Sequence, residues 1–363
     1  MKNLLAIDWV LALAVILLAA IGLTALFSIS TTDNQLNLDH FYRQLISLTI
    51  GLFLMFYLSR FDYRALGLHS TKLYLLSLAL LVIVIIFGIA ARGTVGWIGF
   101  GNWRVQPVEI VKLIVVIFLS SYLSRKRNEL SVFSKTAASV VLISIPVLLI
   151  LKQPDFGSAF IIVTVWLGML LIAGLDKKNL VLIIIFIIMT SVIVPFFLED
   201  YQKDRIANFM NPYHDPQGSG YNVLQSMIAV GSGGFWGKGL GHGSQSQLNF
   251  LPEKHTDFIF AVIAEEMGFF GSAIVLLLFG IIFYRLKEIA RLARDNFGYL
   301  LVVGISLVLF FQLMINIGMN IGLAPVAGVP LPLLSYGGSS LISVFIALGL
   351  AQSVYFRRFK TLD

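Results

Sequence analysis

The sequence predicts an all-α polytopic membrane protein with about ten transmembrane helices. Hydrophobic residues make up 58% of the 363 residues and charged residues only 12%. The mean hydropathy is +0.89. A soluble domain has about 45–50% apolar and about 25% charged residues, so this apolar excess is too large for one buried core. The chain also contains no cysteine, which excludes disulfides and thiolate metal sites.

The expected helices belong to a single integral membrane domain that covers residues 1–363. Each apolar stretch is long enough, or nearly long enough, to cross the hydrocarbon core, which needs about 20 residues. The stretches are residues 5–29, 41–58, 73–91, 107–123, 136–151, 156–175, 180–198, 257–284, 297–323 and 338–356. The first is longer than the apolar part of a signal peptide and lacks a clear cleavage site, so we expect a retained helix.

Basic residues predict how these helices are oriented. With ten helices, 17 of the 26 Lys and Arg residues fall on one side of the membrane. They are Lys2, Arg60, Arg64, Lys72, Arg125, Lys126, Arg127, Lys135, Lys177, Lys178, Arg285, Lys287, Arg291, Arg294, Arg357, Arg358 and Lys360. The positive-inside rule places this side and both termini in the cytoplasm. Topology therefore explains the net charge of +7, and no basic arm or basic face indicates nucleic-acid binding.

The longest connection, about residues 199–256, is expected outside the cytoplasm between the seventh and eighth helices. Loops longer than about 12–15 residues are usually functional or disordered. Apolar residues among the glycines of this loop favour a structured lid or an interfacial segment. These residues are Phe209, Met210, Phe235, Trp236, Leu248, Phe250 and Leu251.

Ionisable groups in or beside a membrane span are costly and are candidates for function. Glu109 and Lys112 follow Pro107 at the start of the fourth helix, and their three-residue spacing allows them to pair on one face. One interpretation is a structural ion pair, and the other is a charged floor beneath an outward-facing cavity. Glu265 and Glu266 lie two turns into the eighth helix, where one is a candidate partner for Lys112 or a polar helix contact.

Two further carboxylates lie at expected helix starts on the outer side. Asp155 is well placed to N-cap the sixth helix, although the neighbouring Lys152 and Gln153 add polar groups that capping does not need. Asp257 ends a cluster of proton-transfer groups with Glu253, Lys254 and His255 at the end of the long loop. A solvated loop explains such a cluster. A carboxylate beside a membrane cavity that acts as a general base or holds a divalent cation explains it too.

Polar residues also mark the last two helices. Gln312, Asn316 and Asn320 are spaced by four, which is typical of hydrogen bonding between helices. The proline-rich segment 325–332 cannot be regular helix, and the glycines in 335–340 permit close backbone approach. Irregular backbone at membrane depth is tolerated only inside protein or around a water-filled cavity.

At these motifs the sequence resembles the SEDS family (shape, elongation, division and sporulation), the ten-helix peptidoglycan polymerases. The matching stretches follow the family order and span most of the chain. They are Gln106–Glu109, Lys152–Gly157, Gly237–Gly241, Pro252–Ala261, Pro330–Pro332 and Ser335–Ser339. The phrases Gly328–Pro332 and Lys152–Asp155 are more similar to the RodA branch than to the FtsW branch.

The chain departs from the family pattern ahead of the fourth helix. Where the family usually has Arg-Trp, this chain has Gly96 and Trp97, and Val108 replaces the usual Ser. Arg92 and Arg104 are the candidates to replace the missing guanidinium.

The resemblance implies a glycosyltransferase of the bacterial cytoplasmic membrane that polymerises lipid II on the outer leaflet during cell elongation. The 4-hydroxyl of the acceptor sugar would attack the anomeric carbon of the lipid-linked donor, and undecaprenyl pyrophosphate would leave. On this basis Asp257 is expected to be the base or a metal-orienting carboxylate. Glu109 and Lys112 would be paired charges of the cavity, and Asp155 a supporting carboxylate.

Ligands and partners also follow from the resemblance. The residues expected to bind substrate are Trp97, His255, Lys152, Arg92 and Arg104, the last three beside the pyrophosphate. The expected cofactor is a divalent cation, Mg²⁺ or Mn²⁺, with Asp257 as its ligand. The expected partners are other membrane proteins of the elongation complex and a class B penicillin-binding protein, the transpeptidase, whose transmembrane helix would pack near the eighth and ninth helices.

Two other functions stay open at the level of sequence. A lipid II flippase, or another lipid transporter, needs polar residues that continue to the cytoplasmic end of the bundle. Polar groups concentrate outside here, with Glu265, Glu266 and the stripe from Gln312 as the main exceptions. A non-catalytic scaffold for cell-wall enzymes would keep full function after Asp257→Ala.

Overall fold

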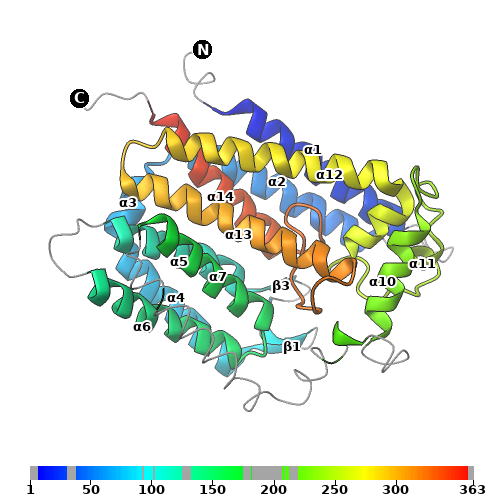
Figure 1. Ribbon diagram of the computed structural model, residues 1–363, viewed down its shortest axis with the longest axis horizontal. Helices are drawn as coiled ribbons and strands as arrows, with labels where there is room; N and C mark the ends of the chain where they lie inside the picture. The colour runs from blue at the N-terminus through cyan, green and yellow to red at the C-terminus, as the bar shows by residue number, and fades with distance from the viewer. Residues whose placement is uncertain are drawn as a thin grey trace.

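A computed structural model describes residues 7–30, 38–91, 94–100, 103–124, 132–174, 181, 207, 209–211 and 220–358. Long helices packed side by side dominate this part of the chain (Figure 1). Six of them are long and apolar enough to cross a membrane, namely α1 (Trp9–Ser30), α2 (Asp39–Arg60), α4 (Ser70–Phe87), α12 (Ile259–Arg291), α13 (Asn296–Asn320) and α14 (Gly338–Phe356). The described helices α5 (Val108–Ser124), α6 (Val132–Leu151) and α7 (Phe156–Ile172) are also rich in apolar residues.

The structure therefore confirms an all-α polytopic membrane fold. These helices account for nine of the ten apolar stretches expected from the sequence. The seventh stretch, residues 180–198, lies outside the described residues apart from Val181. The short helix α3 (Tyr63–Leu68) links α2 to α4. The assignment of residues 1–363 to a single domain stays a prediction.

A small antiparallel sheet between α4 and α5 was not predicted. It has the order β1 (Ile89–Ala91), β2 (Thr94–Phe100), β3 (Trp103–Val105). Three-residue strands are too short to show a period of two in the sequence, and the glycines in β2 weaken that pattern further. The Val95 N–H donates to the Gln153 carbonyl at 3.2 Å, which fastens the sheet to the turn between α6 and α7.

The described part of the long loop, residues 220–256, is structured as expected. It contains α10 (Tyr221–Ser232) and the single turn α11 (Ser244–Gln247). Of the apolar residues expected to be anchors, Leu251 is buried. Large aromatic side chains of the loop are instead exposed, by 56% at Phe235 and 75% at Trp236. Exposure of these rings favours an interfacial segment over a lid held down by its own apolar residues.

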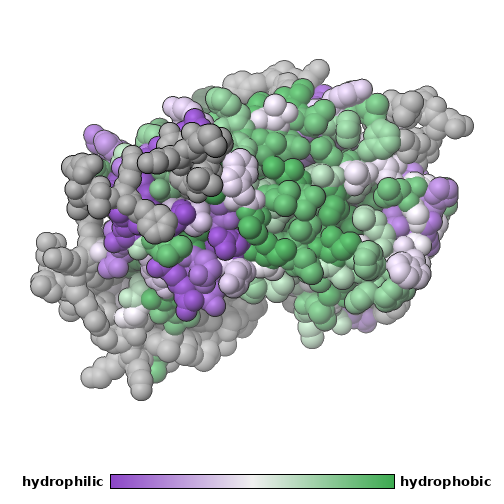
Figure 2. Space-filling model, turned by 90° about the horizontal axis from the view of Figure 1, so that it is seen from above, coloured by the Kyte–Doolittle hydropathy of each residue, from purple (hydrophilic) through white to green (hydrophobic). Residues whose placement is uncertain are grey.

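Two polar contacts between α1 and α12 mark opposite ends of the bundle. Arg285 pairs with buried Asp8 at 2.6 Å, and Ser28 donates to Glu266 at 2.7 Å. At 1.5 Å per residue, the two contacts lie about 30 Å apart along the segment from residue 8 to residue 28. That distance matches the thickness of the hydrocarbon core, about 30 Å. Figure 2 shows hydrophobic residues across the middle of this side of the bundle, with hydrophilic residues toward its ends.

Candidate functional site

A cavity of about 60 Å³ opens at the end of the bundle opposite the Asp8–Arg285 pair, and both candidate carboxylates line it. Asp155 precedes α7, and Asp257 lies just before α12. Thr94 and Trp97 reach the cavity from β2. The fold thus gathers the sheet, the starts of α7, α12 and α14, and the irregular backbone at 327–330 and 336–337 around one space.

Asp155 is an N-cap residue, as predicted, and it is also tied to a second motif. Its Oδ1 accepts the N–H of Ser158 at 2.9 Å, and its Oδ2 accepts from Gln106 Nε2 at 3.3 Å. The backbone N–H of Gln106 donates to Ser339 Oγ at 3.0 Å. Burial raises the pKa of the Asp155 carboxyl, and the Ser158 N–H and Lys112 oppose this rise. Three motifs that are distant in sequence therefore meet at Gln106, which the sequence analysis did not single out.

Hydrogen bonds to its backbone carbonyl hold Asp257 in place. Its carbonyl accepts from Asn316 Nδ2 and from Asn320 Nδ2, each at 3.0 Å. Asn316 Nδ2 also donates to the Val329 carbonyl at 2.8 Å, and Ser335 Oγ donates to the Thr256 carbonyl at 2.6 Å. The predicted hydrogen bonding between helices is confirmed for Asn320, whose Oδ1 accepts the N–H of Ala261 in α12 at 3.0 Å, whereas the amide donors of Asn316 and Asn320 go to the carbonyl of Asp257, just before α12, and that of Asn316 also to Val329. In addition, Asn316 ties the Asp257 side of the cavity to the wall that includes Gly328 and Pro330.

Replacing Asn316 by leucine is expected to destabilise the protein by about 1–3 kcal/mol, because the buried Val329 carbonyl loses its donor and the Asp257 carbonyl keeps only Asn320. Thermal unfolding in detergent measures the change. The matched control is Gln312→Leu on the same helix. Gln312 Oε1 is buried and accepts no hydrogen bond from the described residues, so its loss leaves no donor unsatisfied. Equal losses in the two variants would contradict the assigned role of Asn316.

Glu109 and Lys112 form a buried ion pair in a separate, deeper cavity. Lys112 Nζ lies 2.8 Å from Glu109 Oε1, and both side chains are at most 3% exposed. Gln312 and Ser343 also line this cavity, which has a volume of about 20 Å³. The ion-pair interpretation is confirmed, although the pair does not line the cavity of Asp155 and Asp257.

Of the two interpretations of Glu265 and Glu266, the pairing with Lys112 is wrong, and the polar helix contact is confirmed for Glu266. Glu265 instead pairs with Lys238 of the long loop at 2.9 Å, and Glu266 accepts from Ser28 of α1 at 2.7 Å. The loop and α1 supply these partners, and the sequence offered no pattern that links them to α12.

Of the other candidate binding residues, Trp97 lines the cavity. His255 does not belong to its lining, although the His255 carbonyl accepts the N–H of Tyr336, a lining residue, at 2.8 Å. Lys152 and Arg104 are exposed and do not belong to its lining. Arg92 lies outside the described residues.

Gly96 occupies the position where the family usually has arginine. A Cβ atom at this position would lie 3.5 Å from Gln153 Oε1 and 4.0 Å from Gln106 Nε2. A side chain there would therefore point toward the polar groups that surround Asp155. The described residues place no guanidinium in this space: Arg104 is exposed on β3, where it pairs with Gly99.

Comparisons with known proteins decide the family. The model of the FtsW/RodA/SpoVE cell cycle proteins matches residues 8–358. This chain belongs to that family. The peptidoglycan glycosyltransferase MrdB of Escherichia coli K12 is 38% identical over 347 residues, which cover 94% of this chain and 92% of MrdB.

Solved structures of the family agree with this assignment. The Thermus thermophilus rod shape determining protein RodA superposes with a TM-score of 0.73 at 29% identity, over 99% of this chain and all of that one. A chain from a study of how a peptidoglycan synthase complex coordinates polymerisation and crosslinking superposes with a TM-score of 0.82 at 30% identity. That match covers 98% of this chain and all of the other. The resemblance drawn from the motifs is therefore confirmed, and the chain is a multi-pass membrane protein.

Proposed function

We propose that this FtsW/RodA/SpoVE family member is a peptidoglycan glycosyltransferase that polymerises lipid II during cell elongation. The observation that carries the proposal is the shared cavity of Asp155 and Asp257. Two carboxyl groups at one mouth of a membrane bundle suit a substrate with a sugar head and a lipid tail. The family assignment and the relatives that bear the glycosyltransferase name support the same activity.

The proposed reaction joins a sugar hydroxyl to an anomeric carbon. The acceptor 4-hydroxyl oxygen bonds to the donor C1 as the bond from C1 to the pyrophosphate oxygen breaks. Asp257 accepts the hydroxyl proton, a role that requires a carboxylate within reach of the acceptor. The departing pyrophosphate carries the electron pair and needs positive charge beside it. Lys152, Arg104 and Arg92 remain the proposed cations, and Trp97 and His255 the proposed sugar or headgroup contacts.

The proposed cofactor is a divalent cation, which Asp257 would hold in the alternative role of a metal-orienting carboxylate. The described residues contain no group of three or more His, Asp or Glu side chains that could enclose an ion. Mg²⁺ often binds through one or two carboxylates together with substrate phosphates, and Asp257 offers such an oxygen donor. The ion would neutralise charge on the leaving pyrophosphate.

The proposed orientation puts the cavity outside the cytoplasm. Arg60, Arg285 and Arg357 belong to the end of the bundle away from Asp257, and Arg357 donates to the Arg60 carbonyl at 2.7 Å. This clustering supports cytoplasmic termini under the positive-inside rule. The cavity would then face the outer leaflet.

The proposed partner is a transpeptidase, a class B penicillin-binding protein of the elongation complex. Support comes from the structural neighbour whose study concerns coordinated polymerisation and crosslinking. The exposed faces of α12 and α13 offer apolar side chains to a partner helix, among them Leu277, Phe310 and Met314.

Asp155→Asn separates capping from chemistry. Asparagine caps helices about as well as aspartate, so the unfolding temperature is expected to stay unchanged. We expect polymerisation to fall about tenfold, because the cavity loses one of its two acidic side chains. Full activity in this variant would reduce Asp155 to a capping residue.

Incubation of the purified protein with lipid II in detergent, with and without the transpeptidase, tests the proposed function. We expect glycan strands that depend on Asp257 and on a divalent cation. Movement of lipid II across vesicle membranes without glycan would instead support the flippase, and neither product would support the scaffold.

A further inference from the structure

The long loop packs against α12 at a break in that helix. Gly268 has φ 65° and ψ −162°, and a Cβ atom there would lie 2.3 Å from the Gly237 nitrogen. In a regular helix the carbonyls of Glu265 and Glu266 would accept the N–H groups four residues later. The loop takes over these contacts, since its Lys238 and Gly239 N–H groups donate to the two carbonyls at 3.0 Å.

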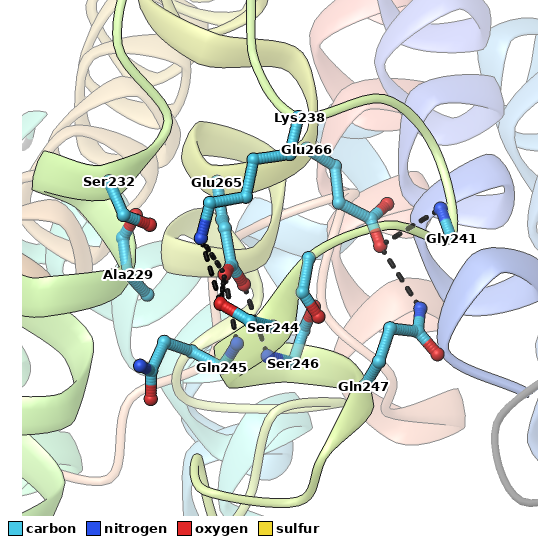
Figure 3. Close-up of polar contacts among 11 residues, drawn as sticks. Ala229, Ser232, Lys238, Gly241, Ser244, Gln245, Ser246, Gln247, Glu265 and Glu266 are labelled. Atoms are coloured by element: carbon cyan, nitrogen blue, oxygen red, sulfur yellow. Dashed lines mark hydrogen bonds and ion pairs between the residues drawn. The ribbon is translucent and has the colours of Figure 1, made fainter.

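The carboxylate of Glu265 holds the loop a second time. It is fully buried and accepts from Lys238 Nζ at 2.9 Å (Figure 3). Its Oε1 also accepts the N–H of Gln245 at 2.9 Å, and its Oε2 accepts the N–H of Ser246 at 3.0 Å. Both carboxylate oxygens are therefore committed to backbone donors of α11.

The carboxylate of Glu266 points to the other side and joins α1 to the loop. Ser28 Oγ donates to it at 2.7 Å, the Gly241 N–H at 3.3 Å and Gln247 Nε2 at 3.2 Å. Figure 3 shows Glu265 and Glu266 directed at different parts of the same loop. We call Glu265, Glu266 and Lys238 the carboxylate latch.

The latch is connected to the candidate site through Ser246 and Lys254. Ser246 donates to Glu265, and its carbonyl accepts from Lys254 Nζ at 2.5 Å. Lys254 is buried and also donates to Asn249 Oδ1 at 2.7 Å. Lys254 lies three residues before Asp257, so the same segment that the latch fixes at one end carries Asp257 at the other.

We propose that Glu265 and Glu266 are positioning residues for glycosyl transfer, an inference that rests on the proposed function. They hold residues 238–254 against α12, and this keeps Asp257 at the mouth of the cavity. Neither carboxylate lines that cavity, so neither touches substrate there. Misplacement of a reacting group by about 1 Å can lower a rate by about 10²-fold.

Glu265→Gln tests the latch with little change in size. An amide has one acceptor oxygen, so its NH₂ group must face one of the N–H donors of Gln245 and Ser246. In Glu266→Gln the hydroxyl of Ser28 and the amide of Gln247 can reorient, and we expect a smaller effect. The control is Glu288→Gln on the same helix, where a partly exposed carboxylate pairs only with Arg291 at 3.3 Å among the described residues.

Hydrogen exchange measures the latch without any activity. In Glu265→Gln we expect the amides of residues 241–257 to exchange at least about tenfold faster, because local opening becomes easier. The Glu288→Gln control should exchange like the parent protein. Unchanged exchange in a folded Glu265→Gln protein would overturn the proposal. If Glu265→Gln does not fold, the double variant Glu266→Gln/Lys238→Gln is measured in its place.

Polymerisation kinetics, corrected for the folded fraction, measure the positioning role. We expect kcat to fall about tenfold in Glu265→Gln with KM for lipid II changed less than about twofold, which is the pattern of a misplaced reacting group. Unchanged kcat, or a raised KM with kcat intact, would overturn it. Should the parent protein make no glycan, the proposed function fails, whereas the exchange result still decides whether the latch holds the loop.

Discussion

Asp257→Asn is expected to lower lipid II polymerisation by about two to four orders of magnitude, the usual contribution of a general base. The fold should survive, because Asn316 and Asn320 hold the backbone carbonyl of residue 257 and not its side chain. Product formation from purified lipid II gives the rate, and thermal unfolding checks the fold.

The matched control for this variant is Glu253→Gln. Glu253 belongs to the same segment and is exposed, and its carboxylate accepts from Thr256 Oγ1 at 2.9 Å. An amide oxygen can accept the same bond, so rate and stability should both stay unchanged. Polymerisation at the parental rate in a folded Asp257→Asn protein would show that Asp257 is not the base of the proposed reaction.

The membrane fold was predictable because hydrophobic length and charge position act locally along the chain. The apolar stretch at 338–356, for example, has the same bounds as α14. Caps are local as well, so Asp155 was identified as an N-cap from its neighbours alone. The sheet at 89–105 was not predicted, because hydrogen bonds between short strands leave too little pattern in the sequence.

The meeting of Asp155 with Asp257 could not be derived from spacing. Their side chains come from turns that are distant in the chain, and only the order of family motifs suggested a common site. Gln106 is the clearest residue that was missed as a site residue. Its motif was recognised, but its two contacts, to Asp155 and Ser339, depend on how α5, α7 and α14 pack.

The partners of buried charges were the least predictable feature. Lys112 finds Glu109 on its own helix, which the three-residue spacing indicated. Glu265 finds Lys238 in the long loop, and no periodicity connects these two residues. A helical pair follows from geometry within one element, whereas a pair between a loop and a helix depends on the complete fold.

Removing only one member of the Glu109–Lys112 pair is expected to have the largest effect on stability. Both side chains are buried, with 2.8 Å between Lys112 Nζ and Glu109 Oε1. Lys112→Met would leave the Glu109 carboxylate without its partner, and breaking such a buried pair costs about 3–5 kcal/mol. Thermal unfolding in detergent should show a large loss for Lys112→Met and for Glu109→Gln.

The double variant Glu109→Gln/Lys112→Met separates stability from chemistry. The attraction between two buried charges exceeds the free-energy cost of removing them from water by little. Replacing both residues is therefore expected to recover most of the lost stability. A double-mutant cycle should therefore give a strong coupling energy between adjacent sites. Additive losses would contradict a direct pair. If the double variant is stable but polymerises lipid II slowly, the two charges also act on the cavity of Asp155. The physical reason is that Lys112 lowers the pKa of the Asp155 carboxyl and Glu109 raises it.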